Sequence, residues 1–184
     1  MKTQIILFII CIILFSCSRN EDENHDDQKY FIKLTINDAA KEEYAKKSPT
    51  GYGFEKSNFE EHASSSKYRL YALDLMNIDI YDYPLKVKTY NWSNANTNNI
   101  MSLTRFSYVD PETNKEYTYM YSSNMPLYNE SSNLSFTINQ TSNGEVKGTF
   151  SGKIVAYDTK TSPYTKKVFN IKNGEVYMPI NKFP

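Results

Sequence analysis

Cys17 is the side chain whose chemistry this sequence signals most clearly. Its thiol follows Leu14-Phe15-Ser16, after a basic start at Lys2 and an apolar run from Ile5 to Phe15. A basic start, an apolar run and a small residue before a cleavage point are typical of a secretory signal peptide. A membrane-spanning helix needs about twenty apolar residues, so the shorter run here argues against a permanent transmembrane segment.

Leu14 to Cys17 resemble a bacterial lipobox, in which the thiol takes a diacylglyceryl group and the peptide is cut just before the cysteine. Each buried methylene contributes about 0.8 kcal/mol, and two acyl chains hold a protein stably on a bilayer. We therefore expect residues 1–16 to be a lipoprotein signal peptide and Cys17 to be lipidated. A plain secretory signal followed by an incidental cysteine is the alternative.

The other cysteine, Cys11, lies inside the expected signal peptide. Lipidation of Cys17 would leave the mature chain without a free thiol. Disulfides, cysteine nucleophiles and thiolate zinc sites are then excluded from the folded part.

Residues 17–29 are polar and mainly acidic, with no apolar side chain after Cys17 that could be buried. This composition predicts a disordered tether. An acidic stretch directly behind a lipidated cysteine also resembles the surface-export signal of Bacteroidetes-type lipoproteins. That resemblance implies the outer face of the outer membrane, and a plain spacer on the periplasmic face is the alternative.

His62 is the histidine that could serve in acid–base or metal chemistry, because His25 falls in the tether. It stands beside Glu60 and Glu61, but a metal site would need a third ligand from elsewhere. No serine has the glycine pattern of a nucleophile elbow. We interpret the surrounding segment as a solvated polar loop.

Paired carboxylates could be formed by Asp74, Asp79 and Asp82. The alternation of Ile78, Asp79 and Ile80 predicts that Asp79 points outward from a half-buried strand. A hydrolase that uses these carboxylates or His62 is therefore the less favoured alternative. We expect a non-catalytic protein with no metal and no cofactor.

Tyrosines are abundant, and Tyr117, Tyr119 and Tyr121 alternate so that they share one face of a strand. With Trp92 they have two interpretations. They could form the core of a sandwich that is poor in leucine, or an exposed platform on which sugar rings or an extended peptide stack.

Short alternating runs of aromatic and β-branched residues, separated by Asn, Ser, Gly and Pro, predict a single all-β domain over residues 30–184. We expect a mainly antiparallel sandwich or a barrel-like fold. The predicted strands are Tyr30 to Ile36, Tyr68 to Leu75, Asn77 to Tyr81, Leu85 to Tyr90, Met101 to Val109, Glu116 to Tyr121, Leu134 to Gln140, Glu145 to Tyr157, Lys166 to Lys172 and Glu175 to Ile180.

Three turn signals predict hairpins: Asp110-Pro111, Asn143-Gly144 and Asn173-Gly174. The glycines Gly148 and Gly152 flank Thr149-Phe150-Ser151, a pattern that predicts a bulged or bent strand with Phe150 in the core.

Residues 38–47 contain good helix formers and begin with a potential N-cap, so they predict one short helix. Residues 48–67 then read as a long loop. The asparagine-rich stretch from Asn91 to Asn99 predicts a second, exposed loop.

The block Gly148-Thr149-Phe150-Ser151, the closing segment Asn173-Gly174-Glu175 and the opening strand near Tyr30 to Asp38 resemble an uncharacterised family of Bacteroidetes-type lipoproteins. Members carry a GTFS strand and a terminal NG hairpin on a β-sandwich-like domain. The family has no established activity, so the resemblance implies a fold and a location and supplies no catalytic residues.

From Lys29 onward cations slightly outnumber anions and form no concentrated stripe, which argues against nucleic-acid binding. We expect a lipid-anchored module whose partner, besides the membrane, is a glycan or an envelope protein. The glycan alternative depends on exposed tyrosines and Trp92.

Overall fold

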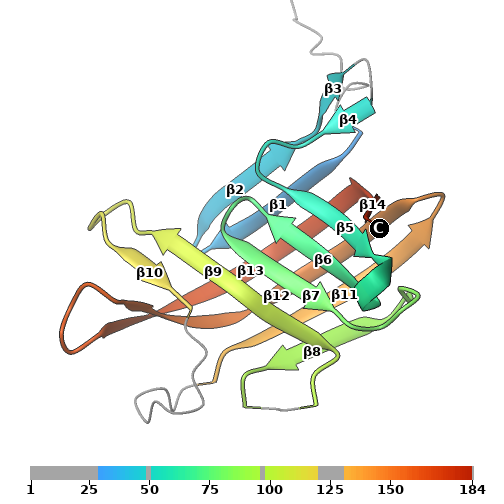
Figure 1. Cartoon of the computed structure of the whole chain (residues 1–184). Coiled ribbons are helices and arrows are strands. Elements are labelled where there is room, and N and C mark those ends of the chain that lie inside the picture. Colours follow the sequence, from blue (N-terminus) through green and yellow to red (C-terminus); the bar gives the residue numbers. More distant parts are fainter. Residues whose placement is uncertain (1–28, 49–50, 96–97, 120–130, 184) are drawn as a thin grey trace, which may run out of the picture.

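The computed structural model describes residues 29–48, 51–95, 98–119 and 131–183 of the 184-residue chain. These residues form an all-β, sandwich-like fold (Figure 1). The strands are β1 Phe31–Ile36, β2 Ala39–Tyr44, β3 Lys46–Ser48, β4 Gly51–Gly53, β5 Asn58–His62, β6 Lys67–Ala72, β7 Met76–Ile80, β8 Thr89–Ser93, β9 Met101–Val109, β10 Glu116–Thr118, β11 Asn133–Ser142, β12 Glu145–Asp158, β13 Thr165–Pro179 and β14 Asn181–Phe183.

The strands build two layers (Figure 1). The front layer runs in the order β14, β5, β6, β7 and β9, and the back layer in the order β2, β1, β13, β12, β11 and β8. β10 pairs with both β9 and β12, so the layers belong to one continuous sheet. β14 pairs with β5 in parallel, whereas the other recorded pairings are antiparallel.

The core lies between the layers and is built largely by alternation along the strands. In β1, for example, Ile32, Leu34 and Ile36 are buried and the residues between them are half-buried. Phe169 of β13 joins the two layers, with its ring centroid 5.2 Å from that of Phe106 and 5.1 Å from that of Tyr108. Burial of such apolar surface is the main driving force for the fold.

Two of the three predicted hairpins are confirmed. Asn143 and Gly144 join β11 to β12 with φ angles of 54° and 75°, as a type I′ turn requires. Asp110 begins the turn between β9 and β10, where its carboxylate accepts a hydrogen bond from the backbone N–H of Glu112 at 3.0 Å.

The third predicted hairpin, at Asn173-Gly174, is wrong, because β13 continues through both residues. Asn173 adopts a φ of 51°, and the register of β13 shifts here against both neighbouring strands. The dipeptide therefore forms a bulge inside a long strand. The predicted irregularity of the facing strand is confirmed: β12 shifts register between Phe150 and Gly152, and Phe150 is buried.

The predicted short helix at residues 38–47 is also wrong, since this stretch contains β2 and the start of β3. Asn37 and Asp38 adopt φ angles of 45° and 71°, which turn the chain back so that β2 pairs with β1 along its whole length. Helix propensity differs by only a few tenths of a kcal/mol per residue, so the gain from strand pairing outweighs it.

The predicted loop over residues 48–67 is wrong in part, because it contains β4, β5 and a short 3-10 turn, Ala63–Ser65. The strand predicted from Leu85 to Tyr90 is displaced: β8 begins at Thr89 and extends to Ser93, into the stretch predicted as a loop. β8 pairs with β11, so that Asn91 lies opposite Ser135 and Trp92 lies opposite Leu134.

Gly174 provides a test of the bulge. A Cβ there would lie 2.4 Å from the carbonyl oxygen of Phe150 and 2.6 Å from its ring. We expect Gly174→Ala to lower the free energy of unfolding by about 2 kcal/mol, because the site is overpacked. Urea unfolding followed by the fluorescence of Trp92, the single tryptophan, measures this change.

Gly53→Ala is the matched control, because nothing lies within 4 Å of the point where its added Cβ would sit, and the residue is exposed. It should change the stability by less than about 0.5 kcal/mol. Equal effects of the two substitutions would contradict the packing described for Gly174.

Candidate functional site

His62 does not lie in a solvated loop, as the sequence predicted, but ends strand β5. Its Nε2 atom is 2.7 Å from Oε2 of Glu60, and its ring stacks on that of Phe183 with centroids 5.6 Å apart. Phe183 belongs to β14, which lies beside β5 in parallel register. The imidazole is thus held by a carboxylate and an aromatic ring at the edge of the front layer.

The three aspartates considered for paired acid–base chemistry have separate surroundings. Asp79 pairs with Arg69, Asp82 accepts hydrogen bonds from lysines, and Asp74 lies exposed in the turn between β6 and β7. The hydrogen bond from Lys88, followed by that from Lys86, lowers the pKa of Asp82 to about 2.

The aromatic residues proposed as a platform lie mainly in the core. Trp92 and Tyr117 are each only 5% exposed, and Tyr119 is half-buried with its ring edge-on to Trp92 at 5.6 Å. Tyr121 and the lipidation residue Cys17 fall outside the described residues. Rings buried in this way cannot stack on a ligand, so the core interpretation holds for Trp92 and Tyr117.

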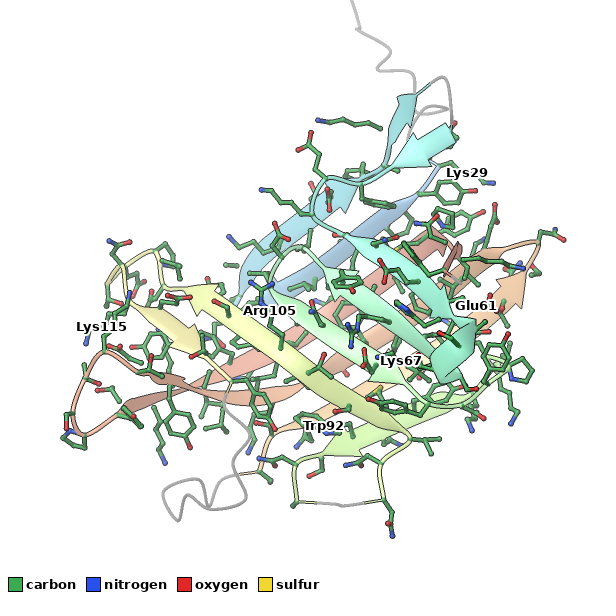
Figure 2. All side chains as sticks on the ribbon, in the orientation of Figure 1. Lys29, Glu61, Lys67, Trp92, Arg105 and Lys115 are labelled. Carbon is green, nitrogen blue, oxygen red and sulfur yellow. The ribbon has the colours of Figure 1, made fainter. Side chains whose placement is uncertain are left out.

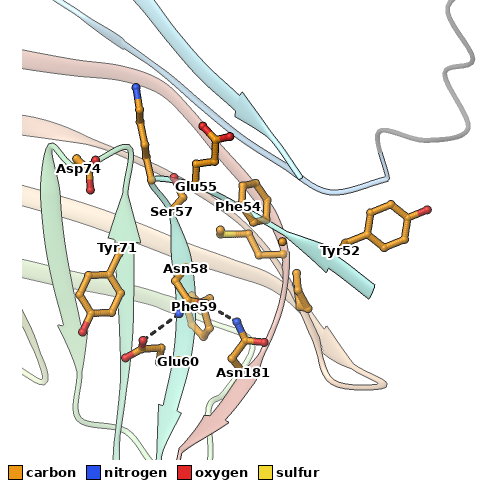
Figure 3. A pocket seen from close by; sticks show the side chains of 14 residues that line it. Tyr52, Phe54, Glu55, Ser57, Asn58, Phe59, Glu60, Tyr71, Asp74 and Asn181 are labelled. Carbon is orange, nitrogen blue, oxygen red and sulfur yellow. Dashed lines mark hydrogen bonds between the residues drawn. The ribbon is translucent and has the colours of Figure 1, made fainter. Parts of the chain in front are cut away.

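The strongest candidate site is a cleft of about 400 Å³ at the edge of the front layer (Figure 3). It lies between the chain segment 52–60, strand β6 and the junction of β13 with β14. Its lining combines aromatic rings, side-chain amides and carboxylates: Tyr52, Phe54, Glu55, Asn58, Glu60, Tyr71, Asp74 and Asn181 among others.

One carboxylate, that of Glu43, holds the wall of this cleft in place. Its Oε1 accepts hydrogen bonds from the backbone N–H groups of Glu55 and Lys56, at 2.7 and 2.8 Å. Its Oε2 accepts one from the hydroxyl of Ser57 at 2.5 Å, and Ser57 Oγ in turn accepts from the backbone N–H of Leu73 at 2.9 Å. The segment is thereby tied to both β2 and the turn after β6.

At the floor of the cleft, Glu60 is already fully engaged. Asn58 Nδ2 donates to its Oε1 at 2.9 Å, and Asn181 donates to Asn58 (Figure 3). His62 Nε2 contacts Oε2 of Glu60. These contacts hold the Glu60 carboxylate in one orientation, with one partner on each oxygen. The cleft thus presents rings, amides and carboxylates, of which Asn58, Glu60 and Asn181 are joined by hydrogen bonds.

Sequence reasoning missed this cleft because its longest wall, residues 52–60, comes from a segment predicted as a loop. No sequence motif contains Tyr71, Asn58 or Asn181, so none of them was predicted as a site residue. The alternation of Asn58, Phe59 and Glu60 was the available signal, because it has the period of a strand with one polar face.

Beside the cleft, the outer face of the front layer carries a row of paired polar side chains. Glu60, Arg69, Asp79 and Ser102 lie directly opposite one another on β5, β6, β7 and β9. Lys67 and Arg105 come from the same layer (Figure 2).

Asp79 is the central charge of this face. Arg69 donates to both of its oxygens, at 2.5 and 2.7 Å, and Lys67 adds a third hydrogen bond at 3.2 Å. The prediction that Asp79 points away from the core is correct in direction, yet the side chain is only 1% exposed because these cations cover it. Burial alone would raise the pKa of Asp79, but the hydrogen bonds and charges of Arg69 and Lys67 outweigh burial and lower it.

Among the described residues, no group of three or more His, Cys, Asp and Glu side chains could hold a metal ion. The same part of the chain contains no helix long and apolar enough to span a bilayer. In comparisons with known proteins, no family model, no curated protein and no solved structure matches the chain. The resemblance to a lipoprotein family therefore stays a prediction.

Asp79→Asn tests the electrostatics of the front face. The change leaves Arg69 and Lys67 beside a neutral, buried group, so we expect a loss of about 3 kcal/mol in unfolding free energy at neutral pH. The lowered pKa means that this stabilisation is complete above pH 3.8, the ordinary value, and is lost as the pH falls further. Urea unfolding of both proteins between pH 7 and pH 2 measures the difference.

Asp74→Asn is the control, because it makes the same chemical change on an exposed turn residue. It should stay within about 0.5 kcal/mol of the wild type at every pH. A difference between Asp79→Asn and the wild type that grew below pH 3.8 would contradict the pairing.

Proposed function

We propose that this chain is an exported, lipid-anchored protein whose β-domain is a non-catalytic binding or envelope-interaction module. The anchor is the thiol of Cys17, within a stretch that resembles a lipobox, and the membrane is its first partner. The acidic stretch after Cys17 favours the surface of the outer membrane, with the periplasmic face as the alternative.

The start of the domain supports a tethered arrangement. Lys29, the first described residue, donates a hydrogen bond to Glu145 at 2.5 Å, and Glu145 also accepts from the hydroxyls of Tyr30 and Tyr177 at 2.6 and 2.8 Å. Chiefly the bond from Lys29, and then those from the tyrosines, lower the pKa of Glu145 to about 2. A chain that leaves the membrane would therefore enter the domain at a firmly held point.

One observation carries the preference for binding: the cleft combines aromatic rings with a few side chains that are held in place, since Asn58 donates to Glu60 and Asn181 donates to Asn58. Rings with a small number of fixed polar groups are typical of sites that recognise the shape and hydrogen-bonding pattern of a ligand.

A hydrolase that uses His62 or carboxylates stays the less favoured alternative, and Asp79 does not support it, because Arg69 and Lys67 already bind both of its oxygens. A glycan platform made of Trp92 and Tyr117 finds no support, because both rings are buried.

Cys17→Ala tests the anchor. We expect the wild type to stay in the membrane fraction and the variant to leave it, because the variant cannot take acyl chains. Immunoblots of membrane and soluble fractions from expressing cells measure the distribution. Cys11→Ala, inside the predicted signal peptide, should leave the protein in the membrane.

Retention of Cys17→Ala in the membrane would contradict anchoring through this residue.

Protease treatment of intact cells distinguishes a domain on the cell surface from one on the periplasmic face. Removal of the wild-type domain from whole cells is the expected result for a surface protein. Protection until the outer membrane is opened would place the domain on the periplasmic side.

A further inference from the structure

The outer face of the back layer carries an ordered array of mostly small polar side chains on β8, β11 and the middle of β12. Strand register sets nine positions in three rows. The rows are Thr89, Thr137 and Thr149; Asn91, Ser135 and Ser151; and Ser93, Asn133 and Lys153. Lys153 is the one charge among the nine. From strand spacings the array measures roughly 10 Å by 14 Å.

Most of these groups have hydrogen-bonding capacity to spare. Thr89 and Thr137 pair with each other at 2.9 Å, and Ser93 Oγ accepts from the backbone N–H of Ala95. Within the part of the chain that the structure describes, the side chains of Asn91, Ser135, Thr149 and Ser151 make no hydrogen bond. On the front layer, by contrast, Arg69 donates a hydrogen bond to Asp79 and Asn58 donates one to Glu60, so these charged groups already have partners.

Two hollows open on this face. One, of about 390 Å³, is lined by polar residues such as Asn91, Asn133 and Ser151, together with Trp92 and Leu134. The other, of about 380 Å³, is lined by Ser135, Thr149, Ser151 and Asn173 among others, with Phe150 and one charged residue, Glu175. Both adjoin Ser151, where β12 shifts register against the bulge of β13. Bulges of this kind re-aim side chains and are common beside binding sites.

We propose that this face of β8, β11 and β12 is a binding site for an uncharged, polyhydroxylated polymer, that is, a neutral polysaccharide chain. The site lies on the opposite layer from the cleft of Figure 3 and depends on neither the cleft nor the anchor. Its hydroxyl and amide groups both donate and accept hydrogen bonds, as the hydroxyls of a sugar do.

The composition of the face argues against the other classes of partner. Nucleic acids and anionic polymers select lysine and arginine stripes, and this array has the single charge of Lys153. Protein interfaces are enriched in aromatic residues, Met and Arg and depleted in Ser. A membrane or an apolar ligand would need an exposed apolar patch, whereas the apolar residues of these strands are at most 5% exposed.

Affinity electrophoresis in native gels tests the proposal. The full chain is run in gels that contain a neutral polysaccharide (soluble starch, xyloglucan, galactomannan or hydroxyethylcellulose) or an anionic one (polygalacturonate or chondroitin sulfate). We expect retardation by at least one neutral polymer and by neither anionic one. The double variant Asn91→Ala/Ser151→Ala should bind about tenfold more weakly, because two free polar groups are removed from exposed positions that the fold does not need.

Ser102→Ala/Thr104→Ala is the matched control on the front layer, and it should bind as the wild type does. Unchanged urea midpoints would show that each variant is folded. Three outcomes overturn the proposal: no retardation by any neutral polymer, retardation only by anionic polymers, or equal retardation of the wild type and Asn91→Ala/Ser151→Ala. If Tyr71→Ala in the cleft abolishes binding while the β8 and β12 variant does not, the polysaccharide site is the cleft and this assignment is wrong.

Discussion

The pairing of β12 with β13 is the constraint on which the rest of the structure depends. These are the two longest strands, and their register runs from Glu145 opposite Pro179 to Asp158 opposite Thr165. β11 and β10 add to one edge of this pair and β1 to the other. β14 continues directly from β13 to reach β5, so the same pair also positions the edge of the front layer where the cleft lies.

Such long strands can serve both layers only if they twist and bend, and the bulge at Asn173 supplies the bend. Gly174 lets the ring of Phe150 pack directly against the backbone of β13, which no side chain at that position would permit. The resulting register shift changes the outer surface of the back layer as well as the core. Ser151, opposite the bulge, adjoins both hollows on the outer face. A core packing requirement thus determines the shape of a surface that could bind a ligand.

Period-two alternation was a sound guide where one face of a strand meets the core, as in β1, β9 and β12, whose predicted bounds agree closely with the structure. It failed for β2, whose side chains are nearly all exposed and whose strand form depends on pairing with β1 and on the turn at Asn37. The same dipeptide, Asn-Gly, made a hairpin at Asn143 and a bulge at Asn173. The local preference of Asn-Gly for positive φ is the same in both places. The strands paired with β13 on each side determine that the dipeptide at Asn173 forms a bulge instead of a hairpin turn.

The candidate site was harder to predict than the fold, because its parts are brought together by pairings distant in sequence. Glu43, Ser57 and Leu73 meet only once β2 and β6 are in place. The two outer faces then differ in a way that residue types alone do not reveal. On the front face, charges are neutralised by neighbours one strand away, so that Asp79 is buried although it points outward. On the back face, small polar groups stand opposite one another and mostly leave their hydrogen bonds unmade. A surface whose polar groups already satisfy one another offers little to a ligand, whereas one that presents them to water can exchange those water contacts for a partner of matching chemistry.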